Sequence, residues 1–291
     1  MASENRVALV TGANKGIGLA IVRNLALRYA ASSKDDVSTI IYLTARSEER
    51  GAEAVKALSD DRRLKEAKAL QQDGGSVSIS FHALDISNSK SIDAVRDYLA
   101  KQHPEGLDVV INNAGIALQG FDSQVVQQTL QTNYYGTLEA SQKLLPLMKQ
   151  TGRLVNVSSI LSAVDRYSPE LRDAFHAASK TSVDAVSSLM AQFQTAVDKG
   201  EQSKSGFPSS AYGVSKAGVT AVTKVLAMLE AQRGSGVLVN ACCPGYVKTD
   251  MTRGGGMITP DEGAQTPVLL ALGDIGTTSG EFWKDEKAKA W

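Results

Sequence analysis

The sequence predicts an α/β protein with a doubly wound parallel sheet of about seven strands and helices on both faces. Three observations carry this prediction. Short apolar runs alternate with amphipathic stretches long enough for helices, the pattern of successive βαβ units. The first apolar run, at 6–10, ends in a glycine-rich turn that opens a helix. A chain of 291 residues, 43% of them hydrophobic, can bury one core, so we expect a single domain over 1–291.

The order of elements follows from periodicity. Apolar runs predict strands at 6–10, 39–46, 76–86, 107–115, 153–160 and 237–243. Helical spacing predicts helices over 18–31, from the end of the second strand to Asp73, over 91–102, over 124–149 and after residue 211. A loop and a short helix follow the sixth strand.

The segment 160–210 interrupts this alternation. Ser168 before Pro169 has the form of an N-cap followed by a first-turn proline. Apolar residues then recur at helical spacing over 183–197, and Gly200 is suited to end that helix. We therefore expect a helical insertion over 160–210, within the same domain.

Composition excludes several classes of protein. The formal net charge is zero, so neither nucleic acid nor an anionic membrane is an expected partner. No apolar run approaches the roughly 20 residues that span a bilayer. The opening stretch MASENRVALV lacks a basic segment before a long apolar one, so no secretory leader is expected.

The two cysteines, Cys242 and Cys243, are adjacent. Neighbouring Cα atoms lie about 3.8 Å apart, too close for an unstrained disulfide, so we expect two reduced thiols and a cytoplasmic protein. Three scattered histidines and no Cys-x-x-Cys make a metal site unexpected.

A glycine turn, TGANKGIG at 11–18, joins the first strand to its helix. Glycine lets the backbone turn tightly and approach a ligand, and the N–H groups and dipole of the helix favour a phosphate. The spacing of Gly12, Gly16 and Gly18 matches neither G-x-G-x-x-G nor the nucleoside triphosphatase loop. A turn without a ligand is the alternative, but its place in the chain favours a dinucleotide and a Rossmann-type fold.

The end of the second strand indicates which dinucleotide. The strand ends in Arg46, with no carboxylate before Glu48 to bond the 2′-hydroxyl of NAD. Lys15 in the glycine turn could reach the same place, and two cations suit the 2′-phosphate of NADP(H). The alternative is that both are solvated surface cations.

The stretch AYGVSKAG at 211–218 places Tyr212 and Lys216 one helical turn apart. They are either a chemical pair or two polar residues on one solvated face. Ser215 nearly fits the hydrolase pattern G-x-S-x-G, but Ala217 breaks it, so a hydrolase is not favoured.

Five motifs occur in order along nearly the whole chain: TGANKGIG, NNAG at 112–115, NVSS at 156–159, AYGVSKAG, and CCPGYVKTDM at 242–251. In this order they resemble the short-chain dehydrogenase/reductase family. The segment 160–210 and the stretch GFPSSAYGVSK resemble the corresponding parts of the monomeric NADPH-dependent carbonyl reductases within that family.

The resemblance implies roles for particular residues. It implies a catalytic set of Asn133, Ser159, Tyr212 and Lys216. With its neighbours, it implies NADP(H) binding by Gly12, Asn14, Lys15, Gly16, Ile17, Gly18, Arg46, Asp85, Ile86, Asn113, Tyr212, Lys216, Pro244, Gly245, Val247 and Thr249. Tyr246 and Met251 follow the sixth strand, where ligands of parallel sheets bind, and are expected to contact substrate, although Tyr246 could instead pack under its loop.

The expected chemistry is reduction of a carbonyl group. An unperturbed tyrosine has a pKa of about 10, so we expect Lys216 to lower the pKa of Tyr212, the proton donor. Ser159 would polarise the carbonyl, and Asn133 would hold a water molecule through its helix backbone. Tyr246 and Met251 suit an apolar small-molecule substrate.

The resulting expectation is an NADPH-dependent carbonyl reductase acting on aldehydes, ketones or quinones. One alternative is a reductase dedicated to a single steroid, terpenoid or alkaloid-like ketone, and another is an NADP(H)-binding regulator without turnover. The resemblance also implies a monomer, because the inserted helices cover a surface that other members use for dimerisation.

Overall fold

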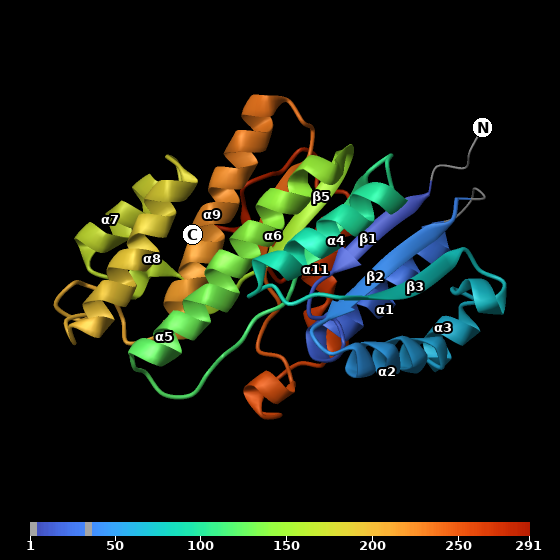
Figure 1. The fold of residues 1–291 in the computed structure, drawn as a ribbon, viewed down its shortest axis with the longest axis horizontal. Helices are drawn as coiled ribbons and strands as arrows, with labels where there is room; N and C mark the ends of the chain where they lie inside the picture. The colour runs from blue at the N-terminus through green and yellow to red at the C-terminus, as the bar shows by residue number, and fades with distance from the viewer. Residues whose placement is uncertain (1–4, 33–36) are drawn as a thin grey trace.

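The computed structural model describes residues 5–32 and 37–291. Within them, eight strands form one sheet in the order β3-β2-β1-β4-β5-β6-β7-β8 (Figure 1). Strands β1 to β7 are parallel, and β8 runs antiparallel to β7. The strands are β1 (Arg6–Val10), β2 (Thr39–Ala45), β3 (Val77–Ala83), β4 (Leu107–Asn112), β5 (Met148–Val157), β6 (Leu238–Cys243), β7 (Phe282–Lys284) and β8 (Lys287–Lys289).

Helices cover both faces of the sheet. In β1 the side chains alternate, so that Leu9 packs into one apolar core and Val10 into the other. The first core holds α4 (Ser89–Gln102), α5 (Ser123–Leu130), α6 (Thr137–Leu144) and α9 (Ala211–Arg233). The second holds α1 (Gly16–Ser32), α2 (Glu48–Ser59), α3 (Arg62–Glu66) and α11 (Gln265–Leu272). The predicted doubly wound α/β fold is confirmed.

Two helices differ from expectation. The charged helix predicted to reach Asp73 breaks after Ser59, because the Asp61 carboxylate accepts hydrogen bonds from Arg63 and Leu64 backbone N–H groups and starts α3. A single 3-10 turn, η1 (Gln71–Asp73), precedes β3.

The helix predicted over 124–149 is also shorter and less regular than expected. Between α5 and α6 lies a π-helical turn, η2 (Gln131–Gly136), and the 3-10 turn η3 (Leu145–Leu147) ends the helical run. β5 then begins at Met148, five positions before the predicted strand start at Arg153. π-helical turns are rare and recur at functional sites, which draws attention to Asn133.

Residues between β5 and α9 form two short 3-10 turns, η4 (Ile160–Ser162) and η5 (Val164–Arg166), and two helices, α7 (Pro169–Ala178) and α8 (Val183–Asp198). Ser168 caps α7 by accepting a hydrogen bond from the Leu171 N–H, and Gly200 follows α8 with a φ of 67°. α8 packs on α5 and α9 at one end of the molecule (Figure 1).

The final strands were not assigned from sequence. β7 and β8 form a hairpin whose tight turn places Asp285 and Glu286 at positive φ. Their short lengths carry little periodic signal. Over the described residues, none of the helices is both long and apolar enough to cross a membrane.

Candidate active site

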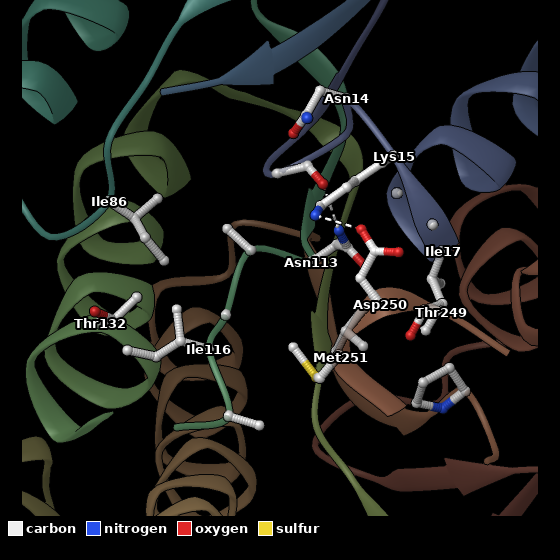
Figure 2. A pocket seen from close by; sticks show the side chains of 18 of the residues that line it. Asn14, Lys15, Ile17, Ile86, Asn113, Ile116, Thr132, Thr249, Asp250 and Met251 are labelled. Atoms are coloured by element: carbon white, nitrogen blue, oxygen red, sulfur yellow. Dashed lines mark hydrogen bonds and ion pairs between the residues drawn. The ribbon is translucent and has the colours of Figure 1, made fainter. Parts of the chain in front are cut away.

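A cavity of about 660 Å³ lies at the carboxyl ends of the parallel strands. Figure 2 shows side chains from separate loops converging on it. It is lined by the glycine turn, Arg46 after β2, Leu84 to Ile86 after β3, Asn113 to Leu118 after β4, Val157 at the end of β5, Ser158 just after it, Tyr212 and Lys216 on α9, and Pro244 and Lys248 to Met251 after β6.

The glycine turn requires its glycines. Gly12 has a φ of 62°, and a Cβ there would lie 2.8 Å from Ala114 Cα. A Cβ at Gly18 would lie 2.5 Å from the Gly12 carbonyl oxygen. Asn113 braces the turn, since its Nδ2 donates to the carbonyl oxygens of Thr11 and Gly12. Gly16, Ile17 and Gly18, the first residues of α1, line the cavity. The first N–H groups of a helix have no partner within the helix, so this N-terminus fits a phosphate.

Two cations and a carboxylate line the part of the cavity near the ends of β1, β2 and β3. Arg46 is exposed at the cavity wall, directly after β2. Asp85 lines the cavity after β3, and its Oδ1 accepts hydrogen bonds from the N–H and hydroxyl of Ser87. Lys15 also lines the cavity, but its Nζ lies 2.6 Å from Asp250 Oδ2, in the loop after β6. These side chains fit NADP(H). The sequence analysis did not single out Asp250.

Tyr212 and Lys216 face the cavity from the first turns of α9. Ser210 caps this helix by accepting a hydrogen bond from the Gly213 N–H, which fixes where the helix starts. Lys216 Nζ lies 5.8 Å from the centroid of the Tyr212 ring and donates to the Val157 carbonyl oxygen at 2.7 Å. Lys216 is only 4% exposed, and burial lowers its pKa to about 8.

The pKa of Tyr212 moves in the direction opposite to that expected. Burial raises it to about 12, while a hydrogen bond with Ser159 lowers it and the Cys243 charge raises it. The prediction that Lys216 lowers this pKa is therefore wrong for the protein by itself. The reason is that desolvation penalises the phenolate, and the Lys216 ammonium is directed at Val157 rather than at the phenol oxygen.

Ser159 and Asn133 support the cavity from behind its wall. Ser159 lies two residues after β5 and caps η4, where its Oγ accepts from the Leu161 N–H at 3.2 Å, and its hydroxyl acts to lower the pKa of Tyr212. Asn133 Oδ1 accepts from the N–H of Ile116, and its Nδ2 donates to Ile116 O and Ser215 Oγ. The structure thus gathers the four expected catalytic residues around one end of the cavity.

Most of the expected cofactor residues line the cavity, but Gly245 and Val247 do not. Tyr246 is also absent from its lining, whereas Met251 is present. Val247 pairs with Ile258 in a short bridge, where successive side chains point to opposite sides. Val247 is buried, so the side chain of Tyr246 points outward and is 55% exposed. Tyr246 therefore does not line the cavity, and its contact with substrate stays a prediction.

Several lining residues were not singled out from sequence. Ala114 and Gly115 within NNAG line the cavity, and Ile116, Ala117 and Leu118 extend the lining beyond it. Their signal was available, because loops at the carboxyl ends of parallel strands face the ligand. Ser158 also lines the cavity, but its hydroxyl is occupied by Lys216 O and Thr220 Oγ1.

A nucleotide-binding turn and a Tyr–Lys pair that line the same cavity of one α/β fold define a dinucleotide-dependent oxidoreductase. The chain matches the short chain dehydrogenase family model over residues 6–198 and 194–256. It belongs to the short-chain dehydrogenase family. It is 42% identical to carbonyl reductase (NADPH) 1 of Homo sapiens over 301 residues and 43% identical to carbonyl reductase (NADPH) 3 of Rattus norvegicus over 302, each match covering 100% of both chains.

Solved structures share the fold. Menthone neomenthol reductase from Mentha piperita superposes with a TM-score of 0.74 at 27% identity, covering 96% of this chain and 98% of that one. Salutaridine reductase from Papaver somniferum gives a TM-score of 0.79 at 24% identity, covering 96% and 99%. At that identity, the second likeness speaks for the fold alone.

Proposed function

We propose that this chain is an NADPH-dependent carbonyl reductase that converts aldehydes, ketones or quinones to alcohols. The observation that carries the proposal is the placement of Tyr212 beside buried Lys216, with Lys216 Nζ 5.8 Å from the Tyr212 ring centroid, both lining a cavity that fits a dinucleotide. Full-length identity of 42–43% to proteins named carbonyl reductase (NADPH) supports both the reaction and the cofactor.

The binding residues divide by the part of NADP(H) they would hold. The glycine turn and the start of α1 hold the pyrophosphate, and Arg46 and Lys15 meet the 2′-phosphate. Asp85 and Ile86 would hold the adenine, Asn113 would lie along the cofactor, and the segment 244–249 would hold the nicotinamide end. When bound, NADPH supplies a hydride to the carbonyl carbon.

The protein's own residues supply the proton. Because burial raises the pKa of Tyr212 to about 12, its phenol carries the proton at neutral pH and can donate it to the carbonyl oxygen. Ser159 donates a hydrogen bond to the same oxygen and stabilises the charge that develops there. With a pKa of about 8, Lys216 keeps most of its positive charge at neutral pH. Its ammonium donates to the Val157 carbonyl oxygen and would be close enough to hold the nicotinamide ribose hydroxyls of a bound cofactor.

Apolar side chains around the cavity support an apolar substrate. Large exposed hydrophobic residues follow three neighbouring strands: Leu118 after β4, Ile160 and Leu161 after β5, and Met251 and Met257 after β6. Exposed apolar clusters of this kind mark binding surfaces. A carbonyl compound with an aromatic or aliphatic body would lie against them.

A steady-state panel of aldehydes, ketones and quinones tests the proposal. We expect NADPH oxidation with several unrelated carbonyl compounds. A single outstanding kcat/KM would support a dedicated ketone reductase, and no turnover with any activated ketone would support a binding regulator. The complete catalytic set and the higher identity to carbonyl reductases favour the first outcome.

We also propose one domain over 1–291 with a helical insertion over 160–210, and a monomer in the cytoplasm. α7 and α8 support the insertion, since β5 and β6 on either side of them pair directly in the sheet. α8 packs on α5 and α9, and this supports a monomer. Light scattering at micromolar concentration would test the oligomeric state. Two free, buried cysteines support a reducing compartment.

A further inference from the structure

An ion pair joins two loops across the cavity. Lys15 lies in the glycine turn before α1, and Asp250 lies in the loop after β6. Their Nζ and Oδ2 atoms are 2.6 Å apart, although the residues are separated by 235 positions in the chain (Figure 2). Both residues line the cavity, and both side chains are largely exposed, 60% for Lys15 and 79% for Asp250.

The residues next to the pair also lie close together. A Cβ at Gly16 would lie 3.3 Å from Thr249 Cγ2, so the loop after β6 packs directly on the glycine turn. Asp250 thereby places a negative charge where the helix N-terminus and Lys15 would otherwise attract only the phosphates of a nucleotide. Lys15 lowers the pKa of the Asp250 carboxyl, mainly through their hydrogen bond, so the carboxylate is ionised at neutral pH.

We propose that Asp250 is a cofactor-specificity residue that acts as an internal competitor of the 2′-phosphate for Lys15. This inference rests on the proposed use of NADP(H). One ammonium group cannot make its strongest contact with a carboxylate and a phosphate dianion at once. The dianion must displace Asp250, whereas a nucleotide without a 2′-phosphate leaves the pair in place.

The displacement has a consequence for the substrate side. Asp250 begins the short turn η6 (Asp250–Thr252), which carries Met251 into the cavity lining. Gly254 to Gly256 follow it, and glycine permits such a loop to change conformation. Binding of the 2′-phosphate therefore removes the ion pair between this loop and the glycine turn, one residue from Met251, while the capping box between Thr249 and Thr252 still holds η6.

Isothermal titration with 2′,5′-ADP and 5′-AMP tests the competition without requiring turnover. Exposed ion pairs are weak, so Asp250→Asn should tighten 2′,5′-ADP binding by about 1.5- to 5-fold at low salt and change 5′-AMP binding less. The gain should shrink at high ionic strength, because salt screens exposed charges. Asp97→Asn, which removes a carboxylate from an exposed ion pair with Arg96 on α4, is the matched control and should change neither affinity.

A double-mutant cycle isolates the role of Lys15. In a Lys15→Met background, Asp250→Asn should no longer improve 2′,5′-ADP binding, because the contested cation is gone. An equal improvement in both backgrounds would show that Asp250 acts through its general field and would overturn the inference, as would weaker 2′,5′-ADP binding in Asp250→Asn. If the unmodified protein binds 2′,5′-ADP no better than 5′-AMP, the proposed NADP(H) preference itself fails.

Discussion

Replacing Lys216 with methionine should remove activity yet leave the fold as stable or more stable at neutral pH. The side chain is 4% exposed, and burial lowers its pKa from 10.5 to about 8. Each pKa unit corresponds to 1.36 kcal/mol, so keeping this ammonium charged in the folded state costs about 3 kcal/mol. The variant avoids that cost but leaves the Val157 carbonyl oxygen without its donor, a loss of about 1–3 kcal/mol. The expected net gain is about 0–2 kcal/mol.

The pH dependence gives the sharper test. The folded-state pKa of Lys216 lies below its unfolded-state value, so between about pH 8 and pH 10.5 the unfolded chain binds more protons than the folded one. The contribution of Lys216 to the free energy of unfolding therefore becomes more favourable as the pH rises from about 8 to about 10.5. The Lys216→Met variant lacks the term, so its stability relative to the unmodified protein should fall by about 2 kcal/mol between about pH 7 and pH 9.5.

Denaturant unfolding at the two pH values measures the difference. Lys101→Met, an exposed lysine on α4, is the matched control and should show no pH-dependent gap. A constant gap for Lys216→Met across this range, or a loss of more than about 3 kcal/mol at neutral pH, would refute the claim that a costly buried cation is retained for chemistry.

Three further outcomes follow. Tyr212→Phe should lower kcat by about 10²- to 10⁴-fold while NADPH affinity, measured by fluorescence titration, stays nearly constant; near-normal turnover would remove Tyr212 from the mechanism. Arg46→Asp should raise KM for NADPH by about 10- to 100-fold and KM for NADH far less, and equal effects on both would contradict its role. Trp291→Phe should lower the free energy of unfolding by about 1 kcal/mol, because it loses the hydrogen bond from Trp291 Nε1 to Ser162 O. Urea unfolding measures this change, and an unchanged transition would contradict it.

Local sequence patterns were enough to locate the first six strands along the chain. Alternating or continuous apolar runs located β1 to β6, because burial on one or both faces imposes those patterns directly. The same reasoning overran at the helix predicted over 124–149. Its apolar spacing continues through a π-helical turn and into β5, and no local signal distinguishes these from α-helix.

The candidate site shows a similar division. The residue types and their order pointed to the cavity, and the structure brings Tyr212, Lys216 and Ser159 together there. Tyr246 was assigned to the cavity because of its place after β6, but side-chain direction in that loop depends on the bridge between Val247 and Ile258. Such a pairing between separate segments leaves no trace in the spacing around Tyr246.

The sequence by itself determined the fold class, the glycine turn and the identity of the residues with chemistry, because these depend on local periodicity and on residue type. Only the tertiary structure decided the electrostatics. Burial, not Lys216, dominates the pKa of Tyr212. Lys15 forms an ion pair with Asp250, which lies 235 positions away in the sequence. Desolvation and ion pairing depend on which atoms surround a charge in space, and that environment is assembled from segments distant in sequence.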